Sequence, residues 1–302
     1  MTNTPLLAFP DVIDNTAISG FRRCEMYGYY NSIRRIKGFE ESTHLIAGGA
    51  FALGLEVTRK AFYEQSLPFS EAFELGVIAI VTEYGEHDPH KKLAAKGVWN
   101  IVAAFEYYFR IWPIDKVLVP FKLATGKYAI EFSFAIPTNV MHPVTGDPIL
   151  YAGKFDMVAQ HEAGLLYVVD EKTSTQLGDY WLTRWRMSNQ MTGYIWAARK
   201  HGIDVKGAWI RGIGILSRNL TSANVPTLRP LWRIAQWERN MELTLNKMIL
   251  SWKHGQYQQN LDQACSAYGG CSYLALCEVP NPEEWIGVNF YANTWSPLNS
   301  RD

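Results

Sequence analysis

Residues 151–172, YAGKFDMVAQHEAGLLYVVDEK, constrain the fold of this chain more than any other segment. Residues 165–169 form an uninterrupted apolar run rich in β-branched and aromatic types, which is typical of a buried strand. A short polar stretch that contains Gly164 precedes this run. We therefore expect two extended arms joined by a turn at residues 161–164, which together form a β-hairpin.

Charged residues follow the apolar strand of this hairpin. Side chains alternate along a strand, so Asp170 and Lys172 face one side while Glu171 faces the other. If the turn is centred near residue 163, Asp156 falls opposite Asp170, with the two Cβ atoms roughly 5 Å apart. Two carboxylates this close repel each other unless a cation lies between them.

A divalent metal ion satisfies that requirement. Mg²⁺ takes oxygen ligands at about 2.1 Å and keeps waters that can become nucleophiles. Lys172 would then orient or deprotonate the attacking water, or stabilise negative charge that develops on a phosphate. The alternative interpretation is that these are ordinary charges at the end of a strand.

The composition limits the class of protein. With 302 residues, 48% of them hydrophobic, the chain can bury the core of one large domain, or of one domain with an appended element. Its formal net charge is zero, so nucleic-acid binding would depend on local basic patches. We find no signal peptide and no run of roughly 20 apolar residues. We therefore expect a cytoplasmic protein that does not associate with membranes, in a compartment where disulfides are disfavoured.

The four cysteines are unevenly distributed. Cys24 lies near the N-terminus, whereas Cys265, Cys271 and Cys277 follow one another with five residues between neighbours. In a reducing compartment, such a set is typical of the ligands of a tetrahedral zinc ion or an iron–sulfur cluster. Four unrelated buried thiols are the alternative. A shared ligand set would tie the two ends of the chain together.

Residues 21–38, FRRCEMYGYYNSIRRIKG, interleave aromatic and basic side chains. We expect either a phosphate-facing DNA-binding surface with tyrosines as stacking partners, or a solvated helix face. The basic residues of this segment are Arg22, Arg23, Arg34, Arg35 and Lys37.

The remaining sequence predicts helices in the first third and strands after it. Gln190 and Tyr194 are four residues apart and so lie on one helix face, which by itself is more typical of a plain surface pair. A charged loop is expected at residues 86–92. Helices are expected at residues 43–65, 70–86, 93–109, 180–201 and 238–254. Strands are expected at residues 117–123, 128–137, 205–216 and 227–234, the last two around a polar loop at residues 217–224, with little regular structure in the cysteine-bearing tail.

Three short motifs stand in a particular order and spacing. They are GKFD at residues 153–156, DEKT at residues 170–173 and QMTGY at residues 190–194. Together they resemble the G-x-x-D, D-x-K-T and Q-x-x-x-Y motifs of the RecB-type branch of the PD-(D/E)XK nucleases. The resemblance extends over about residues 21–277 and is closest to the CRISPR-associated and phage-encoded exonucleases that carry an iron–sulfur cluster.

The resemblance implies roles for particular residues. Cys24 resembles the N-terminal cluster cysteine of the family, and the C-terminal trio resembles the other three ligands of a [4Fe-4S] cluster. The family spaces the first two of that trio only two residues apart, so zinc is the fallback. The implied metal ligands are Asp156, Asp170 and the backbone carbonyl of Glu171; the implied catalytic residue is Lys172, with Gln190 and Tyr194 as supporting residues.

One position departs from the family. In GGAFALGLE, Ala52 stands where the family has a metal-binding histidine, and Glu56 stands where it has an acid one helical turn later. Because alanine cannot bind a metal ion, another group must supply that contact. We favour Glu56; His44, Glu131 or a water molecule are the alternatives.

The resemblance also predicts the architecture. We expect an α/β fold with a central mixed β-sheet flanked by helices, as in the restriction-endonuclease-like core, within a single nuclease domain. The catalytic core would span about residues 110–235, after a helical N-terminal region at about residues 18–109. A cysteine-cluster tail at about residues 255–280 would close onto Cys24.

The expected function is a Mg²⁺- or Mn²⁺-dependent DNA exonuclease with a role like those in phage recombination, repair or CRISPR adaptation. It would act in the host cytoplasm if it is phage-encoded. The alternatives are a structure-specific endonuclease of the same fold and a non-catalytic DNA-end-binding adaptor. ATGK at residues 124–127 lacks the pattern of a phosphate loop, so a helicase or recombination partner would be a separate chain. An oligomer is possible.

Overall fold

The computed structural model describes residues 7–39, 42–85, 94–216, 219–266, 270–293 and 298. The chain forms two compact units. The first unit comprises residues 1–40, 133–153 and 232–302, and the second comprises residues 41–132 and 154–231. Strands β4 (Ile130–Met141) and β5 (Pro148–His161) contribute residues to both units. The charged loop predicted at residues 86–92 lies outside the described residues.

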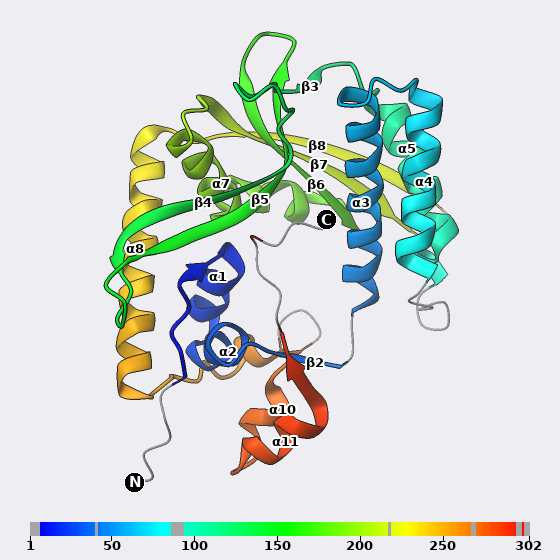
Figure 1. Ribbon diagram of the computed structural model, residues 1–302. Helices are drawn as coiled ribbons and strands as arrows, with labels where there is room; N and C mark the ends of the chain where they lie inside the picture. Colours follow the sequence, from blue (N-terminus) through cyan, green and yellow to red (C-terminus); the bar gives the residue numbers. More distant parts are fainter. Residues whose placement is uncertain are drawn as a thin grey trace. The chain divides into compact units, whose positions relative to one another are not determined.

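The predicted α/β class is confirmed. In the described part of the chain, the main sheet has seven strands, with parallel and antiparallel pairs, and helices flank it (Figure 1). In the second unit, β5, β6, β7 and β8 lie side by side in that order. The pairs β5–β6 and β7–β8 are antiparallel, whereas β6–β7 is parallel. The bounds of the strands not yet given are Leu118–Pro120 for β3, Leu166–Ser174 for β6, Val205–Ile215 for β7 and Leu220–Leu228 for β8.

The predicted hairpin is formed by β5 and β6. Its register pairs Met157 with Val169 and Gln160 with Leu166, so the turn is centred at residue 163 as expected. The backbone N–H of Gly164 donates to the carbonyl of His161 at 2.7 Å, and Gly164 has a φ of +81°, which glycine adopts without steric cost. The apolar run of β6 is thereby aligned along β5.

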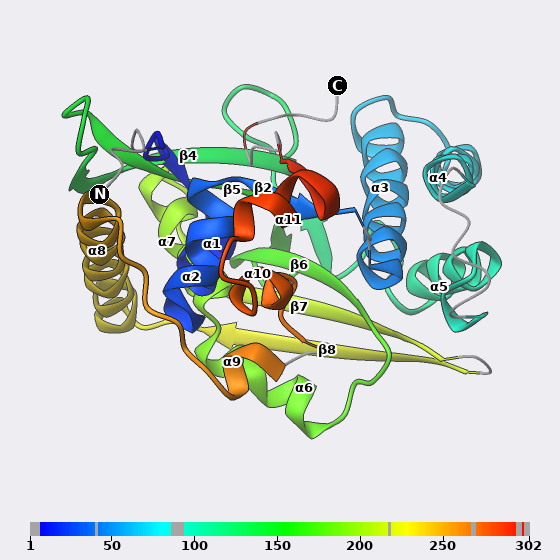
Figure 2. The ribbon, with the colours of Figure 1, turned by 90° about the horizontal axis from the view of Figure 1, so that it is seen from below.

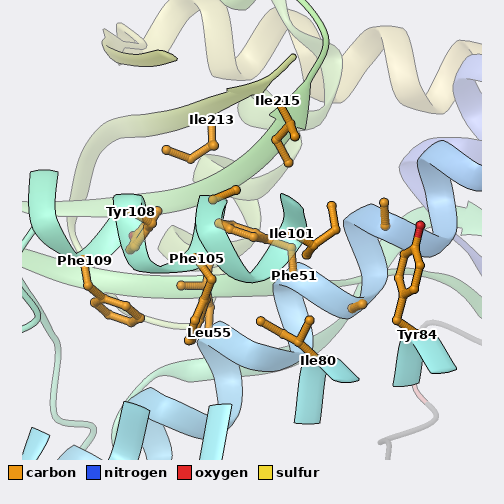
Figure 3. Close-up of a cluster of buried hydrophobic side chains, with 13 residues drawn as sticks. Phe51, Leu55, Ile80, Tyr84, Ile101, Phe105, Tyr108, Phe109, Ile213 and Ile215 are labelled. Atoms are coloured by element: carbon orange, nitrogen blue, oxygen red, sulfur yellow. The ribbon is translucent and has the colours of Figure 1, made fainter. Parts of the chain in front are cut away.

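Helices α3 (Thr43–Tyr63), α4 (Phe69–Gly85) and α5 (Val98–Ile111) form the helical part of the second unit. A short 3₁₀ turn, η2 (Ala94–Lys96), precedes α5. Helix α3 packs against β6, and α5 packs against β7 and β8. The side chains between them form a core rich in aromatic residues (Figure 3). Its labelled members are Phe51, Leu55, Ile80, Tyr84, Ile101, Phe105, Tyr108, Phe109, Ile213 and Ile215.

Small residues bring α3 and α4 close together. A Cβ atom on Gly76 would lie 2.1 Å from Thr58 Oγ1, and one on Gly54 would lie 2.6 Å from the side chain of Ile80. Side chains at these two positions would therefore separate the helices. This close approach fixes the orientation of α3, whose other face carries polar residues of the candidate site described below.

The helix predicted at residues 180–201 is divided. The structure has α6 (Asp179–Thr183), the 3₁₀ turn η3 (Arg184–Met187) and α7 (Asn189–Lys200). Ser188 is extended, with φ −62° and ψ 125°, and its side chain accepts a hydrogen bond from Met191 N at 3.3 Å. It is thus the N-cap of α7. Helix α7 packs against β6 and β7.

The prediction of a strand at residues 227–234 was wrong. Strand β8 begins at Leu220 and pairs with β7 along its whole length. Because β8 is the last strand of the sheet, it tolerates the polar residues that the sequence assigned to a loop. After Pro230 the chain turns into helix α8 (Leu231–His254), which begins seven residues before its predicted start.

The first unit contains short elements around α8. Strand β1 pairs in parallel with the start of β5, matching Val12 with Leu150, and β2 pairs antiparallel with β9. The tail expected to be irregular contains short helices, of which α10 packs against the segment around Tyr30 (Figure 2). Bounds in this unit are β1 Val12–Ile13, α1 Asn15–Arg23, α2 Glu25–Gly28, the π-helical turn η1 Tyr29–Ile33, β2 Ile36–Gly38, α9 Gln263–Ser266, α10 Leu274–Cys277, α11 Pro282–Asn289 and β9 Phe290–Ala292.

None of the helices in the described part of the chain combines the length and hydropathy needed to cross a bilayer.

Candidate active site

The β5–β6 ladder ends one rung before the predicted acid pair. The last backbone pair is Met157 with Val169, and the next would be Asp156 with Asp170. At that point a side-chain hydrogen bond follows the last main-chain pair of the ladder: Asp156 Oδ2 accepts a hydrogen bond from the backbone N–H of Glu171 at 2.7 Å. Asp156 is therefore fixed against β6 by its side chain rather than by its main chain.

Asp170 and Lys172 face the same side of β6, as the alternation predicted. Lys172 Nζ donates to Asp170 Oδ1 at 3.0 Å and lies 2.8 Å from Oδ2. Asp170 is 1% exposed, whereas the side chain of Lys172 is 33% exposed. Asp170 Oδ2 is buried and receives no hydrogen bond of acceptable geometry from the described residues. The ion pair with Lys172 therefore offsets much of the cost of burying this oxygen.

The pKa values of Asp156, Asp170 and Lys172 are all shifted by their surroundings. Burial raises the pKa of Asp156 well above its usual range, and the charge of Asp170 raises it further. Burial also raises the pKa of Asp170, although Lys172 opposes that shift. Burial would lower the pKa of Lys172, but the two aspartates outweigh it and the pKa is raised. The protonated ammonium is thus favoured, beside two acids whose charged forms are disfavoured by burial.

Glu171 faces the other side of β6 and belongs to a buried network that the sequence did not reveal. Arg59 on α3 donates to both carboxylate oxygens of Glu171, at 2.5 and 3.2 Å. The hydroxyl of Tyr108 on α5 donates to the same carboxylate at 2.7 Å. Arg211 on β7 donates to that hydroxyl at 2.9 Å. The network therefore joins two helices to two strands directly behind the acids.

This network shifts the pKa values of its members. Burial alone would raise the pKa of Glu171, but Arg59 and Arg211 outweigh it and the pKa is lowered. Burial raises the pKa of Tyr108 to about 12. One sequence signal could have found Arg59: it follows the buried Phe51 and Leu55 at intervals of four, so it lies on the buried face of α3.

Gln190 and Tyr194 lie on one face of α7, as expected. Gln190 Nε2 donates to the Tyr194 hydroxyl at 3.1 Å. The Tyr194 ring packs edge-on against Phe155, with the ring centroids 5.2 Å apart. The pair is thus in contact with the residue that precedes Asp156.

Three residues were candidates for the metal contact that Ala52 cannot make, and the structure places them in different environments. His44 is exposed in the first turn of α3. Glu56 on α3 pairs with Lys60 at 2.6 Å and is 12% exposed. Glu131 at the start of β4 pairs with Lys154 and is 10% exposed.

In the first unit, the four cysteines lie near one another. Asn260 N–H donates to Cys24 Sγ at 3.4 Å, and Cys265 Sγ donates to Asn260 O at 3.7 Å. The backbone N–H of Cys271 donates to the carbonyl of Cys265 at 2.8 Å. Burial raises the pKa of Cys277 to about 11, and the other three thiols contribute to that shift. All four are free thiols.

The arginines predicted to bind DNA do not share one environment. Arg22 donates to Thr244 Oγ1 and to the carbonyl of Asn240, both at 2.8 Å. The other three differ from Arg22 and from each other: Arg23 stacks over the Tyr27 ring at 4.1 Å, Arg34 pairs with Glu283 at 2.6 Å, and Arg35 is exposed with a φ of +50°.

Across the described ranges, no group of three or more histidine, cysteine, aspartate or glutamate side chains has the geometry to hold a metal ion. The acids of the candidate active site contact lysines or the main chain instead, as Asp170 contacts Lys172 and Asp156 contacts Glu171 N. A cation would replace these contacts.

The chain has no strong similarity to the known proteins with which it was compared. No protein-family model and no curated protein matches the chain. Among solved structures, the chain is similar to a protein described as SSO0001, with a TM-score of 0.35 and 15% identity, over 75% of this chain and 84% of the other. A similarity this weak carries no argument about fold or function.

Replacing Asp156 with asparagine is expected to raise the melting temperature of the metal-free protein near pH 7. The pKa of Asp156 is raised above the usual value of about 3.9, so its ionisation opposes folding as the pH rises through the folded-state pKa. Asparagine keeps an oxygen that can accept from Glu171 N but carries no charge. Thermal unfolding in a chelator from about pH 4 to pH 8 measures the difference. A variant that melts below the wild type at neutral pH contradicts the assignment.

Replacing Glu171 with glutamine should destabilise the protein by about 3–5 kcal/mol, because two buried arginines lose their counter-charge. The lowered pKa of Glu171 means that this contribution is present above about pH 4.3 and is lost as the pH falls through the folded-state pKa. The matched control is Glu56→Gln, which removes only the Lys60 pair and should cost less than about 1 kcal/mol. Urea unfolding at pH 7 measures both; equal effects would show that the network contributes no more than a surface pair.

Proposed function

We propose that this protein is a metal-dependent DNA nuclease, and specifically an exonuclease. The observation that carries the proposal is the pair of acids, the buried Asp170 and the partly buried Asp156, beside the partly exposed ammonium of Lys172. The motifs GKFD, DEKT and QMTGY resemble those that carry the metal ligands and the lysine of the RecB-type nucleases.

The acids suit a Mg²⁺ or Mn²⁺ ion. Asp170 Oδ2 is buried 2.8 Å from the Lys172 ammonium, and the pKa values of both carboxylates are raised because desolvation disfavours their charged forms. Asp156, Asp170 and the backbone carbonyl of Glu171 would hold the ion. Such an ion supplies charge stabilisation for a phosphate and lowers the pKa of bound water.

Lys172 acts as a cation rather than as a base. Its pKa is raised by Asp170 and Asp156, so the ammonium keeps its proton at neutral pH. About a third of the side chain is exposed, so the ammonium is accessible to a phosphate from the solvent side. A protonated lysine there stabilises negative charge on the phosphate oxygens in the transition state.

Helix α7 supports the site from the neighbouring face. The Gln190–Tyr194 hydrogen bond fixes the Tyr194 ring against Phe155, next to Asp156 in β5. We assign this pair to positioning of the strand that carries Asp156, or of bound DNA.

The four cysteines are proposed to hold a [4Fe-4S] cluster, with zinc as the alternative. Their thiols are free, and the influence of the other three on the pKa of Cys277 places them in one neighbourhood. A bound metal centre would stabilise the thiolate forms that burial disfavours. We assign the centre a structural role in the first unit.

Replacing Lys172 with alanine should reduce DNA cleavage by at least about 100-fold while leaving folding and DNA binding largely intact, because the lost ammonium acts in the transition state. The control is Lys206→Ala, which removes a lysine of similar exposure paired with Asp204 at the start of β7. The assay incubates end-labelled linear DNA and circular single-stranded DNA with the purified protein, with and without Mn²⁺.

Each outcome of that assay is informative. Loss of linear DNA alone, only with Mn²⁺, supports an exonuclease, whereas cleavage of the circle supports the structure-specific endonuclease. DNA binding without cleavage or metal dependence supports the adaptor. Full activity of the Lys172 variant contradicts the assignment of the site.

Replacing Cys277 with serine should remove the visible absorption expected of an iron–sulfur protein and lower its melting temperature, because the centre loses one of four ligands. Ultraviolet–visible spectra and iron and zinc analysis of anaerobically purified protein measure this. The control is Ser266→Ala, which changes the residue next to Cys265 without removing a thiol. A wild type that contains neither metal contradicts the cluster.

A further inference from the structure

Two glycines of β7 leave room for bulky side chains on the face of the sheet that carries Lys172. A Cβ atom on Gly212 would collide with the ring of Trp181 on α6, and one on Gly214 would lie 3.3 Å from the side chain of Leu177. Gly212 pairs with Lys172 in the parallel β6–β7 ladder. Because paired residues of neighbouring strands point to the same side of a sheet, Trp181 covers the face from which Lys172 projects.

Helix α6 and the turn η3 follow each other directly and form one segment, residues 179–187, between β6 and α7 (Figure 2). Two tryptophans anchor its inner side. Trp181 is 6% exposed and Trp185 is 5% exposed, and their rings pack edge-on with the centroids 5.3 Å apart. The segment therefore lies against the sheet beside Lys172.

Arg229 fixes this segment to its neighbours. It follows β8 and is buried, and its guanidinium donates to the carbonyl of Trp185 at 2.6 Å and to the hydroxyl of Thr192 on α7 at 2.9 Å. The main chain of the segment is thus held between α7 and the end of β8. A ligand on its outer side would bind a surface that is already ordered, which lowers the entropic cost of binding.

The outer side of the segment carries an aromatic ring and two arginines. Tyr180 is 71% exposed, and Arg184 and Arg186 are exposed as well. Tyr180 and Arg184 are four residues apart in helical backbone, so they are neighbours on one side. The Arg184 guanidinium lies over the Trp185 ring at 4.9 Å. Since Asp179 is the one acid among residues 179–187, the outer side has a net positive charge.

This combination is typical of a surface that binds single-stranded nucleic acid. The bases of a single strand stack on exposed aromatic rings, whereas the bases of a duplex are stacked on one another. Arginines beside the ring contact the phosphates of the same strand. A strand bound on this segment would lie next to the face of the sheet that carries Lys172.

We propose that the outer side of residues 179–187 binds single-stranded DNA, with a base stacked on Tyr180 and with phosphates bound by Arg184 and Arg186. The inference rests on the proposed function and deepens it, because it names an unpaired strand as the substrate that the nuclease holds.

Fluorescence anisotropy of a labelled strand of thymidines and of a labelled duplex, without added divalent metal, measures DNA binding by the full-length protein apart from cleavage. Tyr180→Ala should weaken binding of the single strand by at least about fivefold. Tyr180→Phe keeps the ring and should bind as the wild type does. Arg184→Ala should weaken binding and reduce the slope of log K against log salt concentration by about 0.7, because one phosphate contact is lost.

Matched controls lie on α5. Trp99 is 71% exposed, as Tyr180 is, and Arg110 lies over a tyrosine ring at 5.2 Å, much as Arg184 lies over its tryptophan. Helix α5 covers the opposite face of the sheet, since its Tyr108 contacts Glu171. Trp99→Ala and Arg110→Ala should bind the single strand as the wild type does.

The proposal is overturned if Tyr180→Ala and Arg184→Ala bind the single strand as the wild type does, which is the result expected of a surface for a protein partner. It is also overturned if the α5 controls lose as much binding, if Tyr180→Phe binds as weakly as Tyr180→Ala, or if the wild type prefers the duplex or binds no DNA. Circular dichroism monitors folding. If Arg184→Ala does not fold, Arg184→Gln replaces it, because glutamine keeps part of the aliphatic stem over the ring.

This proposal and the proposed function fail in distinguishable ways. Binding of the single strand that depends on Tyr180, in a protein that cuts no DNA, supports the surface and contradicts the nuclease. Cleavage of DNA by a protein whose single-strand binding is unchanged in Tyr180→Ala and Arg184→Ala supports the nuclease and contradicts the surface.

Discussion

The proximity of two carboxylates, the buried Asp170 and the partly buried Asp156, is the constraint on which this site depends. Carboxylates removed from water are costly in their charged form, and the charge of Asp170 raises the pKa of Asp156 further. Lys172 offsets only part of that charge. The proposed cation would supply positive charge here in addition to that of Lys172.

Because side chains alternate along β6, the residues of the candidate site and the residue that fixes the strand lie on opposite faces. Asp170 and Lys172 face one side, and Glu171 between them is fixed on the other by Arg59 and Tyr108. A buried, fully hydrogen-bonded ion pair contributes rigidity more reliably than net stability. The main chain of β6, including the Glu171 N–H that holds Asp156, is thereby kept in one position relative to α3 and α5.

The sequence predicted what depends on local pattern and missed what depends on contacts distant in the chain. The hairpin and its register follow from an apolar strand and a glycine turn, and the structure has both. The Arg59–Glu171 pair joins residues 112 positions apart, so no local pattern encodes it. Strand β8 was misplaced because the position of a strand at the edge of a sheet, where polar residues are tolerated, is not visible in a single segment. The ladder ends before Asp156, where the Asp156 carboxylate accepts a hydrogen bond from the main chain of Glu171. The alternation of residue types along a strand does not reveal such a side-chain contact.

A crystal of the protein soaked in Mn²⁺ and measured at the manganese absorption edge tests the central claim most directly. We predict an anomalous peak within about 2.2 Å of carboxylate oxygens of both Asp156 and Asp170, with the Lys172 ammonium displaced from Asp170. Manganese bound elsewhere, or both aspartates still in their present contacts at saturating Mn²⁺, would contradict the claim that these acids form a cation site.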